Sequence, residues 1–238
     1  IAMFITVRRS SVITVVLIIC VLCGIYGLYA GDEEQVFQPS GEMRVMIDPG
    51  HGGMDGGAVG VSGVLEKELN LQVAKRLEGL VTEGGGVAMM TRSEDVSLHT
   101  EQDKTVREQK RSDLTRRRSM AGESGADVFV SIHMNQFSQS KYRGAQVFYA
   151  ADENSRRLAE LIRKHLLPVS EKSDGREIKQ AYDTMFILQQ NRLPSVIVEC
   201  GFLSNPEEEA LLQNEAYQEE IAEGIYQGIC EFLTNQTS

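Results

Sequence analysis

Short apolar runs alternate with segments of helical periodicity from Met43 onward, and this alternation constrains the fold more than any other feature. In the segment 66–80, for example, apolar residues recur at the three- and four-residue spacing of an amphipathic helix. Strands alternating with helices over roughly 190 residues predict a single α/β domain with a mostly parallel central sheet flanked by helices. The expected strands are 44–47, 87–90, 126–132, 145–150 and 195–199, and the expected helices are 66–80, 114–122, 153–167, 207–213 and 217–233.

The composition is that of one folded domain and argues against a nucleic-acid partner. Hydrophobic residues make up 42% and charged residues 24% of the chain, as in ordinary globular proteins. The formal net charge of -10 would repel a phosphate backbone. A basic stretch at 104–118 also contains acidic residues, and we interpret it as a solvated loop and helix face. The polar segment 93–112 has no apolar period and is expected to form a long surface loop.

The N-terminal region has the pattern of a membrane span. Residues 11–30 carry no charge and match the length of about 20 residues that crosses a bilayer. Two arginines precede this stretch, so the positive-inside rule places the N-terminus in the cytoplasm and the remainder outside. An uncleaved anchor is favoured over a cleaved signal peptide, because Leu28 fits poorly in an A-x-A-like site ending at Ala30. The expected layout is a cytoplasmic N-terminus (1–10), a transmembrane anchor or signal sequence (11–30), a linker (31–42) and a catalytic domain (43–235).

The four cysteines fall into two groups. Cys20 and Cys23 lie inside the apolar stretch, where neither a metal nor a redox partner would reach them, so we interpret them as small apolar residues. Cys200 and Cys230 belong to the exported part, where a disulfide could form. The sequence leaves that pairing open.

Polar residues that could carry chemistry follow three of the expected strands. His51 comes after the first strand in a segment rich in glycine, His133 and Asn135 come after the third, and Glu199 follows the last. Ligands of open α/β sheets bind outside the carboxyl ends of the strands. We therefore expect two imidazoles and a carboxylate, far apart in sequence, to meet at one edge of the sheet.

The two histidines also have a plainer explanation, whereas Glu199 does not. A histidine at a strand end is more often a hydrogen-bonded structural group than a ligand. An ionised Glu199 beside apolar residues, by contrast, needs a partner, a metal or a function to offset its desolvation. The remaining histidines, His99 and His165, are expected to face solvent.

Two imidazoles and a carboxylate are the usual ligands of a hydrolytic zinc ion that keeps an open position for water. Glu66 is the candidate third ligand, because it opens the expected first helix close to the end of the first strand. The same residue would also complement the helix dipole, and the residues alone leave both roles open. The glycines around His51 would let substrate approach closely. Their spacing is not that of a phosphate-binding loop, and the chain has no G-x-S-x-G serine-hydrolase motif.

Four motifs together resemble the zinc-dependent N-acetylmuramoyl-L-alanine amidases of the amidase-3 family. They are DPGHGG (48–53), EK (66–67), SIHMN (131–135) and VECGFLSNPEE (198–208). The segments TRSEDVSL (91–98) and LTRRRSMA (114–121) also resemble motifs of that family. The resemblance covers residues 43–233 and implies the family's α/β fold.

The resemblance also assigns roles to the candidate residues. It implies that His51, Glu66 and His133 bind zinc, that Glu199 is the catalytic carboxylate, and that Asn135 lies near the metal in the second shell or substrate site. The implied reaction is hydrolysis of the peptidoglycan amide between the lactyl group of N-acetylmuramic acid and L-alanine.

An anchor followed directly by a catalytic domain is similar to the sporulation-specific amidases. These enzymes prepare spore cortex for muramic δ-lactam formation, so the expected location is extracytoplasmic, between the membranes that surround the forespore. The expected contacts are peptidoglycan, the membrane through the N-terminal span, and a possible activating protein.

Two other functions stay open at this point. A zinc carboxypeptidase acting on stem peptides uses a similar ligand set, but its first histidine and glutamate are typically three residues apart, whereas His51 and Glu66 are fifteen apart. A catalytically inactive wall-binding module could retain the same fold. Four intact candidate residues argue against it.

Overall fold

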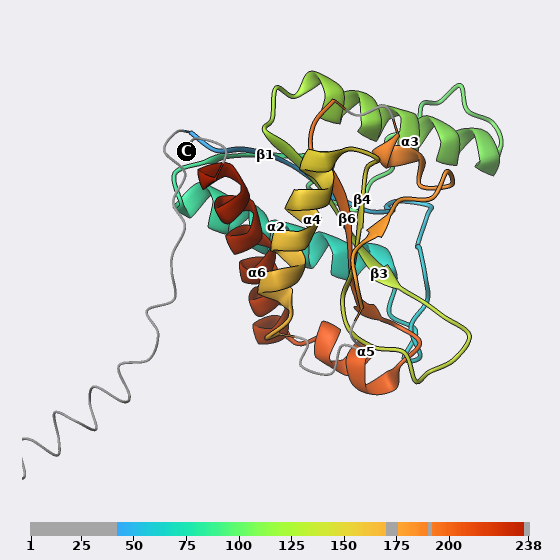
Figure 1. The fold of residues 1–238 in the computed structure, drawn as a ribbon. Helices are drawn as coiled ribbons and strands as arrows, with labels where there is room; N and C mark the ends of the chain where they lie inside the picture. The colour runs from blue at the N-terminus through green and yellow to red at the C-terminus, as the bar shows by residue number, and fades with distance from the viewer. Residues whose placement is uncertain (1–41, 170–175, 190–191, 236–238) are drawn as a thin grey trace, which may run out of the picture. The chain divides into compact units, whose positions relative to one another are not determined.

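A sheet of six strands, in the order β2-β1-β3-β6-β4-β5, lies at the centre of the part of the chain that the structure describes (Figure 1). The computed structural model describes residues 42–169, 176–189 and 192–235. The strands are β1 (Arg44–Pro49), β2 (Val87–Met90), β3 (Val128–Asn135), β4 (Gln146–Tyr149), β5 (Lys179–Gln180) and β6 (Ser195–Phe202). All neighbouring pairs are parallel except β4 with β6, which is antiparallel. The prediction of an α/β fold with a mostly parallel sheet is confirmed.

Helices cover both faces of this sheet. α2, α4 and α6 pack against one face, and α3 packs with the short 3-10 helix η1 against the other (Figure 1). The bounds are α2 (Glu66–Glu83), α3 (Val106–Glu123), α4 (Glu153–Leu166), η1 (Phe186–Leu188), α5 (Pro206–Leu212) and α6 (Glu215–Thr234). The apolar clusters on the two faces differ in size, and the larger one lies on the side of α2, α4 and α6.

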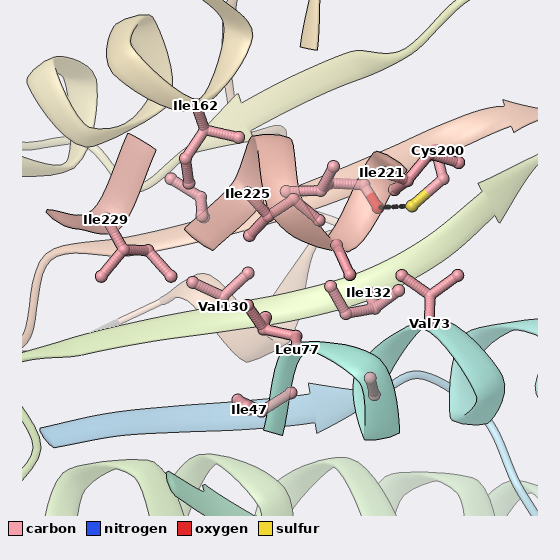
Figure 2. Packing of buried hydrophobic residues seen from close by; sticks show 14 of the residues in the cluster. Ile47, Val73, Leu77, Val130, Ile132, Ile162, Cys200, Ile221, Ile225 and Ile229 are labelled. Atoms are coloured by element: carbon pink, nitrogen blue, oxygen red, sulfur yellow. Dashed lines mark hydrogen bonds between the residues drawn. The ribbon is translucent and has the colours of Figure 1, made fainter. Parts of the chain in front are cut away.

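The alternation of side chains along the strands builds these two clusters. In β3, Val130 and Ile132 belong to the larger cluster, whereas Phe129 belongs to the smaller one beside α3. Figure 2 shows the larger cluster, in which Leu77 of α2 and Ile225 of α6 lie near Val130. Burial of each such side chain stabilises the fold by about 1.5–3 kcal/mol. Successive strand residues point to opposite faces. Ser131 and His133, two and four positions after Phe129, therefore face α3.

The largest departure from the sequence prediction is α3, which begins at Val106 instead of 114. Thr105 and Glu108 form a capping box, in which each side chain accepts a hydrogen bond from the backbone N–H of the other. This cap starts the helix although its first turns are too polar to show an apolar period. The predicted loop 93–112 is therefore wrong in its second half. The two short elements β5 and η1 were not predicted either.

Cys200 and Cys230 are both buried free thiols, so the disulfide left open by the sequence is absent between them. Cys200 contacts the backbone oxygen of Val198 at 3.7 Å (Figure 2). Both cysteines belong to the larger apolar cluster. They therefore act as small apolar core residues.

No helix within residues 42–169, 176–189 and 192–235 is long and apolar enough to cross a membrane. The predicted N-terminus (1–10) and anchor (11–30) lie outside the described residues, together with Cys20 and Cys23. The linker (31–42) also lies outside them except for its last residue.

Candidate active site

The strand residues of the candidate site, His133 and Glu199, lie on the α3 side of the sheet, since they alternate with residues of the larger cluster. His133 of β3 and Glu199 of β6 are direct partners in the register of these two strands. Both strands continue beyond these residues, to Asn135 and Phe202, because backbone pairing does not require apolar side chains. The strand ends predicted at 132 and 199 are therefore too early. His133 and Glu199 project from within the strands, side by side.

The loop after β1 carries His51 in an unusual backbone conformation. His51 has a φ of 61°, in the left-handed region that non-glycine residues rarely adopt. The residue before it, Gly50, lies directly against His133: a Cβ there would be 2.2 Å from the imidazole Cε1. This close approach explains one of the glycines around His51. A side chain at position 50 would displace the second imidazole.

Glu66 lies between the two imidazoles. Its Oε2 is 3.2 Å from Nε2 of His51, and its Oε1 is 3.0 Å from Nδ1 of His133. One donor atom from each of the three residues can be chosen so that all lie within 4.8 Å of one another. The structure thus brings together the three residues expected to bind metal, from a loop, a helix and a strand.

The carboxylate of Glu66 is fixed by further hydrogen bonds. Its Oε2 accepts from the backbone N–H of Ala58 at 2.8 Å, and its Oε1 accepts from that of Met134 at 3.2 Å. Asn70, one turn further along α2, donates to Oε1 at 3.3 Å. Burial raises the pKa of Glu66, but the two histidines outweigh burial and hold it well below its usual range. The carboxylate of Glu66 is therefore anionic and fixed in orientation, as a metal ligand must be.

Asp55 is a functional candidate that sequence reasoning missed. Its Oδ2 lies 2.9 Å from Nδ1 of His51, on the side of the ring opposite Glu66. Burial lowers the pKa of His51, but Asp55 and Glu66 outweigh burial and raise it to about 9. A carboxylate on the second nitrogen of a metal-binding histidine fixes the tautomer and the ring orientation. The signal in the sequence was an aspartate four residues after His51 in the same glycine-rich segment.

Glu199 has a buried oxygen without a partner. Its Oε2 is shielded from solvent and makes no hydrogen bond with any of the described residues. Burial is the largest cause that raises the pKa of Glu199, to about 7, with a further contribution from Glu66. A carboxyl group with this pKa can both accept and donate a proton near neutral pH.

Two buried arginines hold the loop that carries His51. Arg117 of α3 donates to Asp48 at 2.8 Å and to the backbone oxygens of Pro49 and His51 at 2.7 and 2.6 Å. Arg92 donates to the backbone oxygens of Pro49 and Gly50, both at 2.9 Å. The interpretation of 104–118 as a solvated face is therefore wrong for Arg117, which is 1% exposed. The two arginines belong to the segments 91–98 and 114–121 noted above.

Three further residues named from the sequence are Asn135, on the same strand as His133, and the remaining histidines His99 and His165. Asn135 does not line the cavity beside His51 and Glu199, and its backbone oxygen accepts a hydrogen bond from the N–H of Leu203 at 2.8 Å. His99 and His165 are partly buried, not solvent-facing as expected: His99 contacts Ser97, and His165 contacts Glu231 at 2.7 Å. Local hydrogen bonding accounts for the partial burial of both rings.

A cavity of about 240 Å³ opens beside the cluster. His51, His133 and Glu199 line one part of it, Lys110 and Leu114 of α3 line another, and Phe186 of η1 lies in its wall. The site therefore combines charged groups with apolar walls, an arrangement typical of ligand sites.

The donor set fits a zinc ion. Zinc in proteins takes nitrogen and oxygen donors at about 2.0–2.1 Å in a tetrahedral arrangement, which places neighbouring donor atoms roughly 3.3 Å apart. One oxygen of Glu66 lies 3.2 Å from His51 and the other lies 3.0 Å from His133, both close to this separation, and one donor atom from each residue lies within 4.8 Å of the other two. Three protein donors would leave the fourth position for water or substrate.

Comparison with known proteins identifies the family. Residues 45–231 match the amidase-3 family, described as N-acetylmuramoyl-L-alanine amidase. The chain belongs to the amidase-3 family. The prediction of an N-acetylmuramoyl-L-alanine amidase is thereby confirmed, and with it peptidoglycan as the substrate class.

Several individual amidases of this family are similar to the chain. The germination-specific N-acetylmuramoyl-L-alanine amidase of Bacillus subtilis is 36% identical over 81% of this chain and 80% of its own length. The structure of the CwlD amidase from Clostridioides difficile, in complex with the GerS lipoprotein, is 42% identical with a TM-score of 0.77, over 80% of this chain and 98% of that one. The catalytic domain of CwlV, from Bacillus (Paenibacillus) polymyxa, is 33% identical with a TM-score of 0.69, over 80% and 98% of the two chains.

Proposed function

We propose that this amidase is zinc-dependent and hydrolyses the bond between the lactyl group of N-acetylmuramic acid and L-alanine with His51, Glu66 and His133 as metal ligands. One observation carries the proposal. Three donor atoms from separate segments lie within 4.8 Å of one another, and the unpartnered Oε2 of Glu199 lies beside them on the neighbouring strand. A buried carboxylate oxygen without a partner is costly for folding, which supports a functional reason for its presence.

In the proposed mechanism, three residues hold the metal, a fourth orients one of them, and a fifth moves the proton. His51, Glu66 and His133 would hold the ion, and Asp55 would keep the ring of His51 in the required tautomer through its Nδ1. Zinc in such a site lowers the pKa of water and polarises a carbonyl group. Glu199 would accept the proton of the attacking water at Oε2 and return it to the nitrogen of the departing L-alanine. This transfer is needed because an amine anion would be a very poor leaving group.

We propose a role in the peptidoglycan of the spore cortex, where removal of stem peptides precedes muramic δ-lactam formation. The similarity to a germination-specific amidase and to the CwlD amidase supports this role. The CwlD structure contains a lipoprotein, which supports a protein partner for this chain as well.

The proposed layout of the chain follows from the sequence. Residues 1–10 are cytoplasmic, 11–30 anchor the protein, 31–42 form a linker and 43–235 form the catalytic domain. The substrate lies outside the cytoplasmic membrane, which fits this orientation. In a sporulating cell the domain would face the space between the two forespore membranes.

Digestion of purified peptidoglycan, with and without a chelator, tests the proposed reaction. We expect intact stem peptides with new L-alanine amino termini, identified by mass, and loss of this product when the chelator is present. Cleavage within the stem peptide would indicate the carboxypeptidase alternative. Binding to peptidoglycan without any release, after addition of zinc, would indicate an inactive wall-binding module.

A further inference from the structure

The α3 side of the cavity presents a cation close to the site. Lys110, Leu114 and Arg117 line the cavity and lie on one face of α3, since they are three or four residues apart. Nζ of Lys110 lies 3.0 Å from Oδ1 of Asp55, whose other oxygen contacts His51 at 2.9 Å. Only this pair of contacts separates the ammonium group from the imidazole. An extended peptide spans at most about 3.3–3.6 Å per residue, so Lys110 is within reach of the first two or three residues of a bound stem peptide.

The two basic side chains that line this cavity, Arg117 and Lys110, differ in how many hydrogen bonds they make. Arg117 is buried, and its guanidinium group donates to Asp48, Asp113 and two backbone oxygens. Lys110 has a side chain that is 51% exposed, and its contact with Asp55 is the one hydrogen bond that its ammonium makes within the described residues. An ammonium group has three donors. Lys110 can therefore bind a ligand without giving up Asp55.

Apart from Lys110, Arg117 and the two imidazoles, the ionisable side chains that line the cavity are carboxyl groups. Asp55 and Glu199 line it, and Glu66 lies directly behind the imidazoles. A bound zinc ion would offset the charge of Glu66, but an anionic group that lies beside Asp55 would still be repelled unless a second cation faced it. A stem peptide with an acidic residue after L-alanine would present such a carboxylate.

We propose that Lys110 is a specificity-determining residue that binds the carboxylate of the stem-peptide residue after L-alanine. The inference rests on the proposed function, since it assumes that the scissile amide lies at the His51, Glu66 and His133 cluster. Lys110 then selects stem peptides in which this carboxylate is free over those in which it is amidated.

A structural role for Lys110 gives a different expectation. The lysine could serve only to fix Asp55, and through Asp55 the ring of His51. Its loss would then weaken the reaction equally for every substrate. The ratio between two substrates that differ only at the carboxylate separates this role from specificity.

The test uses the full chain, loaded with zinc, and two soluble glycan fragments whose stem peptides carry a carboxylate or a carboxamide on the residue after L-alanine. We expect the unchanged enzyme to have a KM about fivefold lower for the carboxylate, the size expected of a half-exposed charge pair. Lys110→Met should reduce the ratio of the two KM values to about 1, and Lys110→Arg should retain the preference. Arg107→Met is the matched control, because Arg107 is an exposed cation on the same helix outside the cavity lining.

Equilibrium binding of both fragments to Glu199→Gln variants, with and without Lys110→Met, makes the result independent of turnover. A binding preference for the carboxylate that disappears with Lys110→Met supports the inference, even where no cleavage occurs. Absence of cleavage by the unchanged enzyme counts against the proposed function only. Equal KM and binding for the two fragments, or a preference that survives Lys110→Met, overturns the inference.

Discussion

Nη2 of Arg117 donates a hydrogen bond of 2.6 Å to the backbone oxygen of His51, 66 residues earlier in the chain. The same guanidinium group contacts Asp48 at 2.8 Å, at the end of β1. His51 has a left-handed backbone conformation, which persists only where the surroundings hold it. Arg117 therefore links the packing of α3 to the position of a proposed metal ligand.

Replacing Arg117 by lysine should weaken both folding and metal binding. A lysine cannot match the planar set of donors that contacts Asp48, Asp113 and the loop, so buried acceptors would lose their partners. We expect the free energy of unfolding to fall by about 3 kcal/mol, measured by urea denaturation, and the zinc affinity to fall in a chelator competition. Arg116→Lys, the same change at an exposed neighbour, is the control. Equal results for the two variants would contradict this role.

Gly50→Ala should disrupt the site through a steric clash. The added Cβ would be 2.2 Å from Cε1 of His133, so the imidazole must move away from Glu66. We expect a loss of zinc binding of at least about tenfold, the lower end of the loss seen when groups that orient a metal ligand are removed. Gly56→Ala is the matched control in the same loop, because its Cβ would be 3.5 Å from Leu65, an ordinary contact. If Gly50→Ala binds zinc as tightly as Gly56→Ala, the close approach has no function.

Asp55→Ala should reduce zinc affinity without unfolding the domain. The ring of His51 would lose the carboxylate that fixes its Nδ1, and loss of such a partner typically costs about 10–100-fold in metal affinity. Titration against a competing chelator measures the effect. Asp95→Ala provides the comparison, because Asp95 contacts Gly53 and Lys67 of the same region but no imidazole. A similar loss of zinc affinity in both variants would mean that the loop as a whole is disturbed. The contact of Asp55 with the ring of His51 would then have no specific effect.

Stability should decrease in acid partly because of Asp48. Burial raises its pKa, but Arg117, Ser131 and Thr91 outweigh burial and hold the pKa below the ordinary value of 3.8. A carboxyl group whose pKa is lowered by folding stabilises the folded state above its unfolded pKa and loses that contribution as the pH falls through the folded value. The free energy of unfolding should thus decline below about pH 4, and Asp48→Asn should show a shallower decline. Asp183→Asn, the same change at an exposed residue, is the control. If the free energy of unfolding of Asp48→Asn declines with pH as steeply as that of the unchanged protein, the assignment to Asp48 is wrong.

Much of the fold could be predicted because its elements have strong local patterns. The strand 87–90 and the helix start at Glu66 agree with the structure. The early part of α3 could not be found by apolar period, since a capping box starts it. Strand ends were misplaced for a related reason: His133 and Glu199 are polar, but their backbones still pair in the sheet.

The sequence predicted those site residues that lie at the end of an expected strand or at the start of an expected helix. These are His51, His133, Glu199 and Glu66. The contributions of Asp55, Lys110 and Arg117 depend on distances between segments, and Arg117 and Asp48 are 69 residues apart. A run of basic residues does not reveal which of them is buried, and so the interpretation of 104–118 was wrong for Arg117.

The matched variants Glu66→Gln and Glu199→Gln, each assayed for zinc content and turnover on the same preparation, test the central claim most directly. Glu66→Gln should lose zinc and turnover together. Glu199→Gln should retain zinc, while its turnover falls by about 10²–10⁴-fold, the usual contribution of a general base. Loss of zinc in Glu199→Gln, retention of zinc in Glu66→Gln, or full turnover in either variant would contradict the account.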